Sequence, residues 1–210
     1  GNRTVGIEEQ PTTEFLDRLK LVFNFEPPRE HGLDVVRSIH AMLKGQVKVF
    51  FGLGGNFAMA TPDTPRTWDA LRSCDLTVHV TTKLNRSHLV HGKDALILPT
   101  IGRTEIDTQA SGEQAVTVED SFSSVHASFG INKPASEELR SEVAIVAGMA
   151  NAVLGGEKIN WLWYADDYSR IRDVMEQVFD DFYDFNKRIE RPGGFYLRNT
   201  ARNRIWKSKN

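Results

Sequence analysis

The sequence predicts an α/β fold, in which a mostly parallel sheet is covered by helices in three layers, and three observations carry this prediction. A short apolar run at residues 47–51 ends at a cluster of glycines. Two further β-favouring runs follow, at residues 76–81 and 95–98. Segments with a helical spacing of apolar residues come before these runs and between them. Helices that alternate with strands in this way are typical of parallel sheets, because a parallel connection needs a crossover.

Two helices are expected before the first strand. The first runs from Thr12 to about Asn24, and Pro27 ends it because proline cannot continue a helix. The second runs from Leu33 to Leu43, and Gly45 closes the pattern. The apolar residues repeat at spacings of three and four: Phe15, Leu16, Leu19, Val22 and Phe23 in the first helix, and Leu33, Val36, Ile39 and Leu43 in the second.

The run at 47–51 and the glycines after it are the stretch that points to a ligand. The run does not alternate, which indicates a central parallel strand covered on both faces. Gly54 and Gly55, with Gly52 before them, permit positive φ and a close approach of backbone N–H groups to a phosphate, while Asn56 offers an amide. The stretch matches neither the dinucleotide fingerprint nor the P-loop motif, so a plain tight turn is the alternative.

A helix is expected after this loop, and a polar loop after the second strand. Thr64 is expected to cap the helix, with Pro65 at its first position and Trp68 on its buried face. The strand at 76–81 ends in the stretch Thr82-Lys-Leu-Asn-Arg-Ser-His88. The hydroxyls, amides and cations of that stretch suit phosphates, ribose or a purine edge. An ordinary polar loop is the alternative.

The second half of the chain is expected to be partly structured first and then helical. Residues 100–134 form a long polar excursion with one alternating run at 114–118. Ser136 is expected to open a helix that stops at Gly155. A final helix is expected over residues 160–185, where apolar residues recur at three and four. Such a stripe indicates core packing, with a partner surface as the alternative.

The composition narrows the classes of protein to which the chain could belong. Of the 210 residues, 40% are hydrophobic and 26% are charged, which suffices for one core. The formal net charge of −2 gives no general attraction to nucleic acid or to an anionic membrane. Cys74 is the only cysteine, so a reducing, cytoplasmic compartment is expected. No apolar run approaches the roughly 20 residues of a membrane helix.

Few residues outside the two loops suggest chemistry. His79, His88 and His91 are near one another in sequence, but a strand and a turn separate them, which disfavours a shared metal site. No serine or cysteine lies in a nucleophile motif, so we expect neither catalytic nor metal-ligating residues. The acids after the third strand are candidate site residues, with plain surface positions as the alternative: Glu105, Asp107, Glu119 and Asp120.

The order of strand, glycine loop, polar loop and strand resembles the third domain of the bis-molybdopterin guanine dinucleotide (bis-MGD) oxidoreductases, in particular the formate dehydrogenase-like alpha subunits. In that family a strand ends in a Gly-x-Asn-Pro loop, a second strand leads to a Thr-rich helix start, and an Ala-Asp-Val-Val-Leu-Pro strand follows. The corresponding stretches here are 54–56, 82–88 and Asp94-Ala-Leu-Ile-Leu-Pro99. Three more segments look like the formate dehydrogenase-like subgroup: 29–34, 102–105 and 117–121.

The resemblance implies that the chain holds the guanosine diphosphate end of a molybdenum-carrying molybdopterin guanine dinucleotide. It implies these cofactor-binding residues: Leu53, Gly54, Gly55 and Asn56 at the diphosphate or ribose, Thr82, Lys83, Asn85 and Ser87 along the nucleotide, and Glu105 as a recurrent acid. The family's metal ligand and its 4Fe-4S cysteines lie in other parts of a full-length protein, so this chain alone should be inactive. Phe57 stands where the family has proline, and no aspartate ends the second strand, so the residues themselves give no preference for guanine.

Together these inferences predict a Rossmann-like cofactor-binding domain excised from a longer oxidoreductase, which carries out two-electron chemistry on a small substrate such as formate. Residues 1–46 would be a helical lead-in, 47–156 the α/β domain and 157–210 a C-terminal helical extension, packed as one unit. The expected partners are the pterin dinucleotide and the remaining domains of the parent chain, without nucleic acid or membrane. Two alternatives stay open: a regulatory or assembly module that keeps the fold without ligand, and a domain that binds NAD or a flavin.

Overall fold

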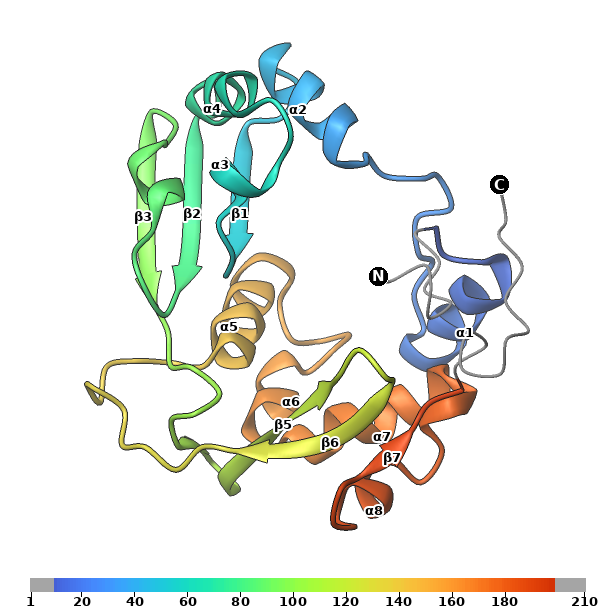
Figure 1. Ribbon diagram of the computed structural model, residues 1–210. Helices are drawn as coiled ribbons and strands as arrows, with labels where there is room; N and C mark the ends of the chain where they lie inside the picture. Colours follow the sequence, from blue (N-terminus) through green and yellow to red (C-terminus); the bar gives the residue numbers. More distant parts are fainter. Residues whose placement is uncertain (1–9, 199–210) are drawn as a thin grey trace. The chain divides into compact units, whose positions relative to one another are not determined.

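The structure is a computed structural model that describes residues 10–198, and the chain forms two compact units within it (Figure 1). We call them the parallel-sheet unit, His31–Gly102 with Pro134–Glu142, and the antiparallel-sheet unit, Gly1–Glu30 with Arg103–Lys133 and Val143–Asn210. The predicted α/β class with a parallel sheet is confirmed. The predicted division at residues 46 and 156 stays a prediction.

The parallel-sheet unit alternates strands with helical segments. Its elements are α2 (Val35–Leu43), β1 (Val49–Leu53), α3 (Phe57–Ala60), α4 (Thr64–Arg72), β2 (Leu76–Thr81), the 3-10 helix η2 (Arg86–Leu89) and β3 (Asp94–Pro99). The strands are parallel in the order β1-β2-β3, with Phe51 opposite Val78 and Val78 opposite Leu96. The three predicted strands and the helix that closes at Gly45 are therefore confirmed.

The first strand is not central, contrary to the prediction. β1 forms one edge of the three-stranded sheet, and Val49 is 54% exposed. The central strand is β2, whose residues 77–81 are all buried. β1 has one buried face, which Phe50 occupies where it packs against the helices. The next residue on that face is Gly52, which has no side chain, so the sequence of β1 does not show the alternation expected of an edge strand.

The core of this unit lies between one face of the sheet and the helices. Phe50 packs against a cluster that joins α2 to α4, namely Ile39, Met42, Ala70 and Cys74. A second cluster under α3 consists of Ala58, Leu71 and Val90, again in contact with Phe50. Cys74 is 1% exposed, as expected for a cysteine that precedes a buried strand.

Two local predictions in this unit are wrong in detail. Asp63, not Thr64, caps α4: its carboxylate accepts a hydrogen bond from Arg66 N, and its φ is +57°. Thr64 is the first helical residue and Pro65 the second. The connection from β2 to β3 is the short 3-10 helix η2 and not an α-helix, which a connection of only twelve residues between Thr81 and Asp94 allows.

The antiparallel-sheet unit contains the elements that were predicted least well from the sequence. They are α1 (Thr13–Phe23), β4 (Asp107–Gln109), β5 (Gly112–Glu119), β6 (Ser124–Phe129), α5 (Glu142–Leu154), α6 (Trp161–Asp166), α7 (Tyr168–Val178), η3 (Asp180–Phe182), α8 (Phe185–Ile189) and β7 (Phe195–Tyr196), with the first residue of α5 in the other unit. The four strands are antiparallel in the order β4-β5-β6-β7. The excursion at 100–134, predicted to be partly structured, contains β4, β5 and β6, and its alternating run at 114–118 lies within β5.

Two predicted helices have different bounds. α5 begins at Glu142 and not at Ser136, although it ends before Gly155 as predicted. Ser136 instead accepts a hydrogen bond from Glu138 N in a turn, and Arg140 pairs with Thr100 beyond the end of β3. The pairing with Thr100 holds this segment out of the helix.

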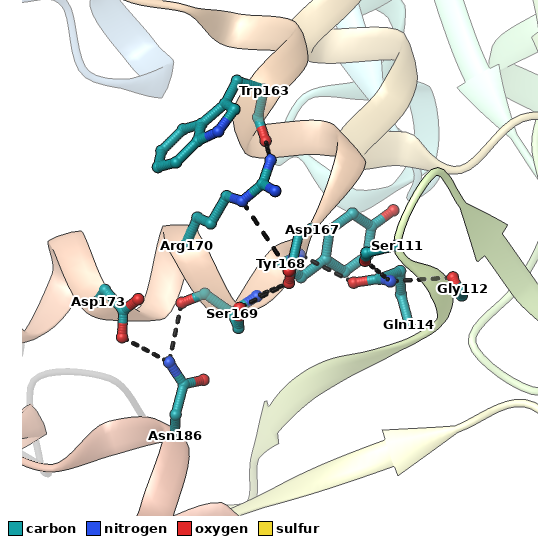
Figure 2. Close-up of polar contacts among 10 residues, drawn as sticks. All are labelled: Ser111, Gly112, Gln114, Trp163, Asp167, Tyr168, Ser169, Arg170, Asp173 and Asn186. Atoms are coloured by element: carbon teal, nitrogen blue, oxygen red, sulfur yellow. Dashed lines mark hydrogen bonds and ion pairs between the residues drawn. The ribbon is translucent and has the colours of Figure 1, made fainter.

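The single helix predicted over 160–185 is interrupted. Asn160, the predicted start of the helix, caps α6, but Asp167 is extended, ends α6, and caps α7 by accepting from Ser169 N and Oγ (Figure 2). The helices attach to the sheet: Gln114 accepts from Tyr168 N and donates to Ser111 and Gly112. The interpretation of the apolar stripe as core is confirmed, since Tyr168 and Val178 are buried and Met175 packs against the cluster Val125, Phe185, Ile189 and Phe195.

No helix in residues 10–198 is both long and apolar enough to cross a membrane.

Candidate functional site

The candidate site is the carboxyl edge of the parallel sheet. The strands β1, β2 and β3 all end there, since they are parallel. Three segments follow them: the glycine loop (residues 54–56), the second loop (residues 82–88) and the end of the segment 134–142. In open α/β sheets this edge is where ligands bind.

The glycine loop presents bare backbone. Gly54 and Gly55 have φ of +66° and +72°, a region that residues with a Cβ rarely adopt. Gly54 N–H donates to Val80 O of the neighbouring strand at 2.8 Å, which fixes where the loop leaves the sheet. A Cβ at Gly55 would meet nothing within 4 Å, so the loop is open on that side. Leu53, the last residue of β1, is 49% exposed.

The second loop is hydrogen-bonded to the glycine loop. Ser87 Oγ donates to Asn56 Oδ1 at 2.9 Å and accepts from Ala58 N at 3.0 Å. Asn85 Nδ2 donates to Gly55 O at 2.8 Å. The predicted site residues Gly55, Asn56, Asn85 and Ser87 are thus brought together by the structure, from positions about thirty residues apart in the chain.

The start of the second loop is exposed. Thr81 Oγ1 donates to Lys83 O at 2.7 Å and accepts from Lys83 N, which forms a tight turn after β2. Thr82 and Lys83 lie on the surface of this turn. Lys83 has no ion-pair partner among residues 10–198, so its ammonium group can meet an anion.

A carboxylate that sequence reasoning missed lies beside the glycine loop. Arg140 O accepts from Thr100 Oγ1 at 2.7 Å and from Ile101 N at 3.1 Å, which anchors its segment beyond β3. Two residues later, Glu142 Oε1 lies 3.7 Å from the position that a Cβ on Gly54 would take. No local sequence pattern could predict this position, because Glu142 and Gly54 are 88 positions apart in the chain. Glu142 reaches the glycine loop because Arg140 pairs with Thr100 beyond the end of β3.

A histidine pair lies under the second loop. His79, in the middle of β2, is 5% exposed, and its Nε2 has no hydrogen-bond partner among the described residues. Its ring meets the His88 ring edge-on, with centroids 4.9 Å apart. Burial first, and the neighbouring His88 second, hold the pKa of His79 below its usual value. His88 Nδ1 accepts from Asn85 N at 2.8 Å, which holds the ring against the start of η2.

The four acids named as candidates, Glu105, Asp107, Glu119 and Asp120, belong to the antiparallel-sheet unit. Glu105 forms an isolated bridge with Asn132, where the chain passes so close that a Cβ at Gly130 would lie 1.8 Å from Glu105 O. Asp107 is buried and accepts from the hydroxyl of Tyr168 and from Gln109. Asp120 accepts from Phe122 N and Ser124 N in the β5–β6 turn. Asp107 and Asp120 therefore have structural roles. Among residues 10–198, no three His, Cys, Asp or Glu side chains gather as a metal site.

Comparisons with known proteins give long matches to parts of larger proteins. No family model matches the chain. The chain is 49% identical over 206 residues to Protein YdeP of Escherichia coli, which covers 98% of this chain and 27% of that protein. It is 51% identical over 203 residues to the uncharacterized oxidoreductase Rv2900c of Mycobacterium tuberculosis, which covers 96% of this chain and 26% of that protein. The chain thus spans about a quarter of the length of the curated relatives it matches.

Proposed function

We propose that this chain is the part of an oxidoreductase that binds the nucleotide end of a molybdopterin guanine dinucleotide, in an enzyme similar to the formate dehydrogenase alpha subunits. The observation that carries the proposal is the positive-φ loop Gly54-Gly55 at the carboxyl edge of a parallel sheet, which is open at Gly55, together with the exposed Lys83 in the neighbouring second loop. The name of the mycobacterial relative, an oxidoreductase at 51% identity, supports the redox part.

The residues present fit a nucleoside diphosphate. Neither Gly55 N–H nor Asn56 N–H has an acceptor among the described residues, so two consecutive backbone donors are available at an open surface. Backbone N–H groups in such a turn are an anion-binding arrangement. Thr82 adds a hydroxyl and Lys83 a positive charge. The bases of guanine and adenine are not distinguished by these groups, so the preference for guanine rests on the resemblance.

In the proposed function the chain binds and orients, and the chemistry takes place elsewhere. The cofactor, when bound, would supply a metal that accepts or donates two electrons. Leu53, the glycine loop, Thr82 and Lys83 would hold its remote end, and the binding energy gained there fixes the position of the reactive end. The partners proposed are therefore the pterin dinucleotide and further domains of a longer chain, which would carry the metal ligand and any iron–sulfur cysteines.

A glycine substitution tests this proposal. Gly55→Val forces a β-branched residue to φ near +72° and puts a side chain on the open face, so it should abolish binding of guanosine diphosphate, measured by calorimetry. Gly32→Val is the matched control, because a Cβ there also meets nothing within 4 Å but lies outside the site. Loss of binding in the folded Gly55 variant alone supports the proposal. Tighter binding of adenosine diphosphate or NAD by the unsubstituted protein would favour another nucleotide, and a folded protein that binds none of them would favour the assembly module.

A further inference from the structure

The contacts of Ser87 lie inside the protein and not on its surface. Ser87 is 2% exposed, and its hydroxyl donates to Asn56 Oδ1 and accepts from Ala58 N. Because the residue is buried and its O–H donor is already used, this hydroxyl is closed to a ligand at the surface. We propose that Ser87 and Asn85 are positioning residues, which set the conformation of the glycine loop and leave ligand contact to the loop itself, Thr82 and Lys83; the inference rests on the proposed function.

The bond from Asn85 has a directional consequence. Asn85 Nδ2 holds Gly55 O at 2.8 Å, and the peptide between Gly55 and Asn56 is trans. In a planar trans peptide the C=O and the N–H point in opposite directions. Since Gly55 O points toward the second loop, Asn56 N–H points away from it, toward the side on which it has no acceptor among the described residues. Asn85 thus aims a ligand donor without contacting the ligand.

The bonds of Ser87 fix the other end of the loop. Asn56 is the N-cap of α3, yet its side chain makes no capping bond to that helix. Its Oδ1 is held by Ser87 instead, and the same hydroxyl receives the N–H of Ala58 in the first turn of α3. One hydroxyl therefore fixes the side chain of Asn56 and the helix that follows it.

The second loop is itself fixed by hydrogen bonds, so it holds the glycine loop in one position. Asn85 Oδ1 accepts from Ser87 N at 2.9 Å, and His88 Nδ1 accepts from Asn85 N, a capping box around η2. Linked hydrogen bonds of this kind restrict both loops to one conformation, most strongly at Ala58 N, where the bond to Ser87 is buried. The glycine loop thus takes its shape from β2 and η2 as much as from its own residues.

Ser87→Ala is the first test, with Ser73→Ala as the matched control. Ser73 Oγ also makes two hydrogen bonds in the same unit, to the backbone oxygens Met42 O and Ala70 O, but it lies before β2, at the opposite edge of the sheet. Because Ser73 is exposed, Ser73→Ala should cost no more stability than Ser87→Ala in urea unfolding. Only Ser87→Ala should weaken binding of guanosine diphosphate, by about tenfold, the effect of roughly one buried hydrogen bond. Asn85→Ala is a second variant with the same expected loss, should Ser87→Ala fail to fold.

Amide hydrogen exchange supplies a readout that needs no ligand. Ser87→Ala should accelerate exchange at Gly54 N–H, which bonds Val80 O, and at Met59 N–H in α3, while Val78 in β2 stays protected. Acceleration confined to Ala58, together with unchanged affinity, would overturn the inference. If the unsubstituted protein binds no nucleotide, the proposed function fails, and the exchange pattern still decides whether Ser87 positions the loop.

Discussion

His79 lies in the central strand β2 with one ring nitrogen that has no partner among the described residues. Its pKa is lowered, by burial first and by His88 second, so the folded protein resists protonating this ring. The unfolded chain takes up the proton at about pH 6.5, the ordinary value for histidine. The stabilisation from neutral His79 is therefore complete above about pH 6.5 and is lost as the pH falls through the lowered pKa of the folded state.

Urea unfolding across pH 5 to 8 measures this dependence. The free energy of unfolding should fall on the acid side, and His79→Gln should flatten the curve because glutamine does not titrate. His40→Gln, at an exposed position on α2, is the control and should leave the curve unchanged. A slope that survives in His79→Gln would assign the acid sensitivity to other groups.

Asp107 gives a second prediction for a single residue. Its carboxylate is 7% exposed and accepts from the Tyr168 hydroxyl and from Gln109. Tyr168→Phe removes one donor from a buried charge and should cost about 1–3 kcal/mol in the free energy of unfolding. Tyr183→Phe, at a 60% exposed side chain, should change it by less than about 0.5 kcal/mol. Equal effects would mean that the Asp107 bond contributes nothing particular.

At the scale of elements, the connection between η2 and β3 depends on a glycine. A Cβ at Gly92 would lie 2.3 Å from Cys74 O, a backbone atom that cannot move aside cheaply. Gly92→Ala should therefore destabilise the protein by about 1–3 kcal/mol, measured by urea unfolding. Gly32→Ala meets nothing within 4 Å and should be nearly neutral. A neutral Gly92→Ala would mean that the connection moves away from Cys74 without cost.

Glu142 affects the glycine loop through its charge. Its carboxylate lies beside Gly54 and would repel a bound diphosphate. Glu142→Gln should raise the affinity for guanosine diphosphate by about threefold at low ionic strength, and less at high salt, because salt screens exposed charges. Glu138→Gln, on the same segment, is the control. A lower affinity in Glu142→Gln would show that the carboxylate accepts a hydrogen bond from the ligand.

The elements also show what the sequence could and could not predict. β2 was predicted with its observed bounds because a run of β-favouring residues stands between polar turns. The start of α5 was wrong because Ser136 and its acids also suit a turn, and the bond from Thr100 to Arg140 decides between the two. β4 and β7 were missed because two or three residues show no periodicity.

The same reasoning applies to the candidate site. The glycine loop could be predicted because backbone conformations with positive φ strongly favour glycine. The engagement of Ser87 with Asn56 was not visible, because a polar residue in a loop gives no sign of whether it faces the ligand or the protein. The position of Glu142 could not be predicted, because it depends on the pairing of Arg140 with Thr100 beyond the sheet edge.

For the whole molecule, the account rests on one claim: the carboxyl edge of the parallel sheet binds a nucleoside diphosphate. The long matches at about 50% identity, each covering about a quarter of a larger protein, fit a binding module within a longer oxidoreductase.

The most direct measurement is a calorimetric titration of the chain with guanosine diphosphate, beside adenosine diphosphate and NAD, repeated with Asn56→Leu. Asn56 Oδ1 accepts the hydrogen bond from Ser87, and the backbone N–H of Asn56 faces the open side. Leucine therefore removes the side-chain amide, and with it this bond, but leaves a side chain of similar size in place. We predict binding of guanosine diphosphate that Asn56→Leu weakens by at least about tenfold, the loss expected for Ser87→Ala, which breaks the same hydrogen bond. Binding that is unchanged in Asn56→Leu would place the ligand elsewhere and contradict the account, and so would a folded protein that binds none of the three.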